Sequence, residues 1–209
     1  MLEMDPLSAI IDWVAEYGLY GLLLLGIFER FVPILPSYGV LVAIGIAADE
    51  GAWSLIWAIS GSVLGSLLGA LILYRIVLSL REERIHRLLA WIGRMTGISA
   101  ARIDSSITMF RKHQRGLSFG MQLVPSIRLI SPVIAGLFRA NGKAFALATM
   151  LGILCWNGLF IVVGYAASTI APDTNASALA IQVVVVLLVV ELLLALIWRW
   201  YHVSVRKKA

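Results

Sequence analysis

An arginine stands inside an apolar stretch of the chain, GMQLVPSIRLISPVIAG, which covers residues 120–136. This residue is Arg128, and a proline lies a few positions away on each side. A guanidinium group at membrane depth is costly, so it usually pairs with another group or faces a cavity. Its planar donors suit a phosphate or a carboxylate. We therefore expect Arg128, with Gln122 and Ser131 near it in sequence, to meet a polar ligand.

A second charged pair, Glu29 and Arg30, comes shortly before Pro33 and Pro36. One interpretation is that both belong to the ligand site, with Glu29 as a proton-titrating or gating partner of Arg128. Another is that the pair lies in the headgroup layer. A third is that Glu29 and Arg128 form an ion pair that only holds two segments together. These interpretations stay open at this point.

Two further features concern helices within the membrane. Gly61, Gly65 and Gly69 are spaced four apart, so one helix face carries no side chains and lets another helix approach closely. The partner of this face, a neighbouring segment or a second subunit, stays open. Glu191 interrupts a long apolar run, and it is either a functional acid or a protonated residue in helix packing.

The composition of the chain is that of an integral membrane protein. Of its 209 residues, 60% are hydrophobic and 14% are charged, whereas a soluble domain carries about a quarter charged residues. No phosphate-binding loop, dinucleotide motif or cysteine cluster is present, and the histidines lack a second ligand at metal spacing. We expect a transporter rather than an enzyme, with no catalytic residue, cofactor, metal or nucleic-acid partner. The sequence GLSFG matches a hydrolase motif, but that motif needs a strand before its helix, so Ser118 is not expected to be a nucleophile.

The apolar stretches predict the elements that position these residues. A bilayer core takes about 20 helical residues, and the stretches 53–80, 144–170 and 178–200 suit single spans. The stretch 18–48 is too long for one span and is broken by its prolines, so we expect a re-entrant hairpin of two half-helices. The stretch 116–139, broken at Pro125 and Pro132, is either a span or a second hairpin.

The distribution of lysine and arginine along the chain distinguishes between a span and a hairpin at 116–139. If 116–139 is a hairpin, every Lys and Arg except Arg30 and Arg128 falls on one side of the membrane, in 75–115, 139–143 and 199–208. The positive-inside rule favours this arrangement and makes that side cytoplasmic. The predicted fold is a single all-α integral membrane domain, with an inverted repeat of two re-entrant hairpins, about three full spans and a basic interfacial segment, 81–115. Such repeats with broken helices are a transporter design.

The motifs resemble those of the DedA family, also called the VTT or SNARE-associated membrane protein family. The resemblance covers roughly residues 10–170. The matching positions are Glu29, Pro33, Pro36, Ser37, Tyr74, Arg75, Phe110, Gly116, Pro125, Arg128, Pro132, Ala135, Gly136, Phe145, Gly152, Trp156, Gly164 and Tyr165.

This resemblance implies a flippase-like or scramblase-like transporter of phospholipid or polyprenyl phosphate, proton-linked in some members. We also expect a bacterial cytoplasmic (inner) membrane, and the positive-inside rule places 81–115 and the C-terminus in the cytoplasm. Two positions depart from the family's pattern, which commonly has an acid at Tyr38 and an arginine at Gln122; both bear on proton coupling and on the charge of the substrate. The alternatives are a non-catalytic scaffold or assembly protein and an intramembrane enzyme acting on a lipid phosphate or ester. A homo-oligomer stays open.

Overall fold

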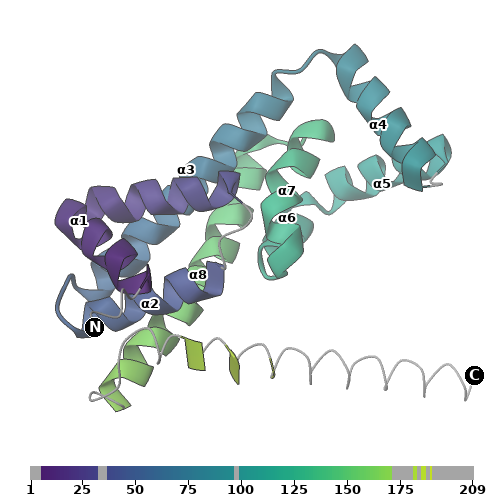
Figure 1. Ribbon diagram of the computed structural model, residues 1–209. Helices are drawn as coiled ribbons and strands as arrows, with labels where there is room; N and C mark the ends of the chain where they lie inside the picture. The colour runs from purple at the N-terminus through teal and green to yellow at the C-terminus, as the bar shows by residue number, and fades with distance from the viewer. Residues whose placement is uncertain are drawn as a thin grey trace, which may run out of the picture.

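The computed structural model of the chain describes residues 6–32, 37–96 and 99–170, with 181–182, 185–186 and 189. The predictions for Pro33, Pro36 and Glu191, and most of the predicted span 178–200, lie outside the described residues. The helices are α1 (Pro6–Phe31), α2 (Ser37–Asp49), α3 (Leu55–Leu78), α4 (Glu82–Thr96), α5 (Ala100–Lys112), α6 (Gln114–Gln122), α7 (Pro125–Leu137) and α8 (Gly142–Ile170) (Figure 1).

The predicted all-α class is confirmed for the described residues. The two long helices, α3 with 24 residues and α8 with 29, are apolar and long enough to cross a bilayer. They correspond to the predicted spans 53–80 and 144–170. Their apolar surfaces are consistent with the membrane protein that the composition predicts.

The predicted first hairpin, 18–48, consists of two short helices. The 26-residue element α1 consists of two shorter helices joined by a kink at Gly18, which has a positive φ (φ 53°, ψ −126°) that favours glycine. Residues 19–31 therefore form one arm and α2 forms the other, with 13 residues. Every residue from 39 to 48 is buried, so α2 is surrounded by protein on all sides.

The second proline-containing stretch also forms two short helices, α6 and α7. They are separated at Leu123 and Val124, and Pro125 occupies the start of α7, where its missing N–H costs nothing. The prediction of a break at Pro132 is wrong, because this residue lies within α7. A proline inside a helix frees one carbonyl four residues earlier, here that of Arg128, and that carbonyl has another donor, described below.

The predicted interfacial segment 81–115 is two helices, α4 and α5, which extend away from the long helices (Figure 1). Ile85 of α4 is buried against Val77 and Leu137, whereas Trp91 and Met95 are exposed. The helix is thus attached at its beginning and exposes large apolar side chains further along, as expected for a helix at the membrane surface.

The packing of the membrane helices repeats within the chain. In each half, two short helices precede a long one: α1, α2 and α3, then α6, α7 and α8. The first short helix packs on the long helix of its own half, so α1 lies on α3 and α6 lies on α8. The second packs on the long helix of the other half, so α2 lies on α8 and α7 lies on α3. The two halves are therefore interleaved.

Glycines stand at each of these four contacts. The predicted glycine face of α3 packs against α1: Gly61 lies by Leu22, Gly65 by the backbone of Leu23, and Gly69 by the stem of Arg30. The other three contacts have equivalent glycines: Gly45 and Gly164 between α2 and α8, Gly152 between α6 and α8, and Gly136 between α7 and α3. Small residues let backbones approach closely, which provides the dispersion contacts that hold membrane helices together.

Two glycines of α8 offer a matched test of this packing. A methyl group at Gly164 would overlap the carbonyl of Val42, whereas one at Gly158 would meet nothing within 4 Å. We expect Gly164→Ala to destabilise the protein by about 1–3 kcal/mol. Gly158→Ala should be neutral or stabilising by up to about 1 kcal/mol, because alanine favours helix. Unfolding in detergent micelles measures both, and equal effects would contradict a close α2–α8 contact.

Candidate functional site

An ion pair joins the two sets of short helices. Nη2 of Arg128, in the first turns of α7, lies 2.6 Å from Oε1 of Glu29, near the end of α1. Both residues are buried, with 1% and 5% of their surface exposed. The sequence left this pairing open as one of three interpretations, and the structure contains it. Burying two charges is costly, and removing one partner leaves the other charge uncompensated.

Arg30 connects the same two regions through a second set of bonds. Its Nη1 donates to Oε1 of Gln122 and to the carbonyl oxygen of Arg128, both at 3.2 Å. Nε2 of Gln122 in turn donates to Oγ of Ser131, also at 3.2 Å. The structure thus brings together all five of the predicted ligand-site residues, from three helices. Their role in transport stays a prediction.

The position of Pro132 explains one of these bonds. In a regular helix, the N–H of residue 132 would donate to the carbonyl of residue 128. Proline has no N–H, so the Arg128 carbonyl is left available, and the Arg30 guanidinium takes the place of the missing donor. The proline therefore provides an acceptor at the centre of the site without ending α7.

Contacts with the long helices give the depth of the site. The Arg30 stem packs against Gly69, a little beyond the middle of α3, and Gln122 packs against Gly152 of α8. The guanidinium carbon of Arg128 lies 5.2 Å from the ring centre of Trp156, which is midway along α8. The charged residues therefore lie near the midpoints of two helices that are long and apolar enough to cross a bilayer once.

Aromatic rings form one wall of the site. Trp156 contacts Arg128 in cation–π geometry. Its ring also packs on Tyr38, at 5.6 Å between centres, and on Phe160, at 4.8 Å. The sequence named Trp156 as a family match and missed it as a site residue. The signal was available, since tryptophan usually marks the ends of a span and this one is central.

Further buried polar groups lie along α8. Nδ2 of Asn157 donates to Oγ of Ser66 on α3 at 3.2 Å. Within the described residues, Oδ1 of Asn157, Nε1 of Trp156 and Oγ1 of Thr149 have no hydrogen-bond partner. Buried polar groups of this kind are usually satisfied by water or a ligand. Sequence reasoning missed Asn157 and Thr149, whose signal was a polar type in the middle of an apolar span.

Residues 32–166 of the chain match the VTT domain family. The chain belongs to this family. Among its relatives are the undecaprenyl phosphate transporters A of Staphylococcus aureus, with 23% identity over 74% of the chain and 76% of the relative, and of Bacillus subtilis, with 26% identity over 76% of each. An alkaline phosphatase-like protein of Lactococcus lactis subsp. cremoris has 28% identity over 75% of the chain and 74% of the relative. No solved structure matches the chain.

The VTT domain match covers three of the five site residues. Gln122, Arg128 and Ser131 lie inside the matched range, whereas Glu29 and Arg30 come just before it. The resemblance to the DedA family, which the motifs predicted, is confirmed by this match.

Other predictions concern chemistry beyond the ion pair. Ser118 is buried within α6 and does not follow a strand, so its surroundings are unlike those of a hydrolase nucleophile. Among the described residues, no group of three or more His, Cys, Asp and Glu is arranged to hold a metal ion.

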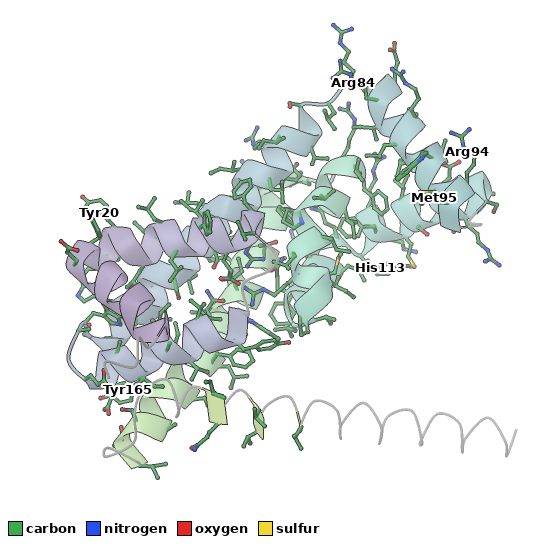
Figure 2. All side chains as sticks on the ribbon, in the orientation of Figure 1. Tyr20, Arg84, Arg94, Met95, His113 and Tyr165 are labelled. Carbon is green, nitrogen blue, oxygen red and sulfur yellow. The ribbon has the colours of Figure 1, made fainter. Side chains whose placement is uncertain are left out.

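A basic pocket of about 430 Å³ lies where α5 meets α6 in this VTT domain protein. It is lined by Arg111, Lys112, His113, Gln114, Arg115, Gly116 and Ala144. Figure 2 shows His113 at the same end of the protein as Arg84 and Arg94, away from Tyr20 and Tyr165. The pocket residue His113 thus lies on the same side of the protein as the basic helix α4.

A double-mutant cycle tests the ion pair. We expect Arg128→Met and Glu29→Gln each to destabilise the protein by about 3–5 kcal/mol, because each leaves one buried charge without its partner. The double variant should lose clearly less than the sum of the two. The free energy of unfolding in mixed micelles measures all four proteins, and additive losses would show that the two groups do not interact.

Proposed function

We propose that this protein moves a phosphate-bearing lipid across the bilayer, with the headgroup passing through the Glu29–Arg128 site while the acyl chains stay in lipid. The observation that supports this most is a pair of buried guanidinium groups near the middle of the apolar layer. A headgroup that leaves water loses its hydrogen bonds, and arginine donors restore them at the depth where the loss is greatest. The names of the two transporter relatives agree with this chemistry.

The short helices form two re-entrant hairpins in this proposal. One is residues 19–49, from the first arm through α2, and the other is α6 with α7. Non-helical backbone at membrane depth is tolerated only where protein or a polar cavity surrounds it. The burial of α2 and the hydrogen bond from Arg30 to the carbonyl oxygen of Arg128 support this arrangement. The segment 178–200 is the third span.

Glu29 has a defined part in the cycle. It holds Arg128 when the site is empty, and an arriving phosphate competes with its carboxylate for the same guanidinium. A displaced carboxylate in an apolar layer is neutralised most cheaply by a proton. In this proposal Glu29 is the residue that links transport to protons. The acid that the family commonly has just after the proline pair is replaced by Tyr38 in this chain.

Transport is measured in proteoliposomes with fluorescent lipid in both leaflets and an impermeant quencher outside. With the wild type, nearly all of the label should be quenched, and with Arg128→Gln only about half, the outer leaflet, because a buried charge-assisted contact of roughly 1.5–3 kcal/mol is lost. Arg75→Gln is the matched control, since Arg75 is an exposed arginine near the end of α3. Phosphatidylglycerol and a polyprenyl phosphate are both assayed, with and without a proton gradient.

The same vesicles separate the alternatives. Recovery of the labelled lipid without its phosphate would indicate an enzyme, as the alkaline phosphatase-like relatives invite one to check. If the wild type stops at half quenching with every lipid and gradient, the transport proposal fails. The scaffold alternative then predicts that Gly65→Leu removes function in cells and that Arg128→Gln retains it.

The orientation is tested by cysteine labelling. We propose a bacterial cytoplasmic membrane, with α4, α5 and the C-terminus inside the cell, because the basic residues gather on that side. In a Cys155→Ser background, Glu3→Cys and Glu50→Cys should react with an impermeant reagent in intact cells, and Arg94→Cys only after lysis. Protection of position 3 would instead make α1 a full crossing.

A further inference from the structure

Arg30 has two guanidinium nitrogens that the described residues do not use. Only 4% of the residue is exposed. Its Nη1 is used twice, by Gln122 and by the Arg128 carbonyl, whereas Nε and Nη2 have no hydrogen-bond partner among the described residues. These two nitrogens form one edge of the planar group, with parallel N–H bonds that match two oxygens of a phosphate.

The described residues of the site also carry an excess of positive charge. Two guanidinium groups, those of Arg30 and Arg128, face the single carboxylate of Glu29. The loop between α1 and α2 has the sequence PILP and adds no charge. An uncompensated cation at this depth is costly, so the site favours an occupant with a net negative charge.

The position of Arg30 is fixed by its surroundings. Its Cγ would lie 3.0 Å from a methyl group placed at Gly69, so the stem lies directly on the α3 backbone. The two bonds of Nη1 hold the other end against α6 and α7. The free edge is thereby held in one orientation before a ligand arrives. Nε1 of Trp156, which packs beside Arg128, is a further buried donor that no described residue accepts from.

We infer that Arg30 is the specificity-determining residue of this site: its Nε–Nη2 edge binds a headgroup phosphate and selects net-anionic headgroups over zwitterionic ones. A choline or ethanolamine headgroup brings an ammonium group toward a cluster that is already positive, whereas a glycerol headgroup or a phosphate monoester does not. The inference rests on the proposed function only in taking the ligand to be a lipid phosphate. It concerns binding and does not require that the lipid be moved.

Binding is measured on the purified full-length protein in a neutral detergent, from the shift of thermal unfolding with added lipid. The probes are dioctanoyl phosphatidylglycerol, farnesyl phosphate and dioctanoyl phosphatidylcholine. The wild type should bind both anionic probes more tightly than phosphatidylcholine. Arg30→Gln should weaken anionic binding by about tenfold and change phosphatidylcholine binding much less. Arg30→Lys should fall between, because it keeps the charge and loses the two-donor edge.

Arg75→Gln, with the same change at an exposed position, should bind like the wild type. A purely structural role of Arg30 would weaken all three probes alike, so an unchanged anionic preference in Arg30→Gln would overturn the inference. So would an absence of preference in the wild type. Glu191, which lies outside the described residues, is a further acid that is checked as a competitor for Arg30. If Glu191→Gln binds the anionic probes more tightly than the wild type, the Glu191 carboxylate competes with them for Arg30, and the inference is overturned. If binding shows the preference and the vesicles show no transport, the proposed function alone fails.

Discussion

The apolar layer of a membrane offers no hydrogen bonds, and the structure depends on how this chain supplies its own. Two breaks between helices place polar backbone and the charges of Glu29, Arg30 and Arg128 inside the protein, among apolar helices. The Glu29–Arg128 pair joins the tip of α1 to the start of α7, and Arg30 bonds the carbonyl that Pro132 leaves available. The end of α1 and the start of α7 therefore supply hydrogen bonds and opposite charge to each other. Either half alone would expose unpaired polar groups to lipid.

Glycines at the helix contacts allow these polar groups from the two halves to come within bonding distance. An ion pair of 2.6 Å between side chains from different halves requires their helices to be held at fixed separations. Gly65, Gly152 and Gly164 bring α3 close to α1, α8 close to α6 and α8 close to α2, so the helices that carry the polar groups are closely packed. This close packing supplies stability through dispersion, which leaves the polar groups available for recognition.

Much of this arrangement could be predicted from the sequence. Hydrophobic length located both long helices, and the prolines with the distribution of basic residues located the two interrupted stretches. The type and depth of Arg128, Glu29 and Arg30 indicated the site. The sequence could not show that Pro132 lies inside a helix, because a proline has the same signature whether it ends a helix or frees a carbonyl for a distant donor.

The remaining gaps have a similar cause. Trp156, Asn157 and Ser66 belong to two helices that are mostly apolar. A few small polar residues in such a helix are a weak signal until a partner is seen, as Asn157 and Ser66 are for each other. The sequence also does not show that α2 packs on α8 and that α7 packs on α3. It shows the glycines that permit such close packing, but not which helix each glycine contacts.

The interleaving of the two halves also bears on how the chain is made. The helix α2 ends at Asp49, and α8, on which it packs, begins at Gly142. At a synthesis rate of about 5–20 residues per second, roughly 5–20 seconds separate the emergence of these two helices. During that interval α2 contacts only α1 and α3 and lacks the helix on which it mainly packs. Such a segment needs shelter within the insertion machinery or at the membrane surface, and the packing of α2 waits for translation of α8.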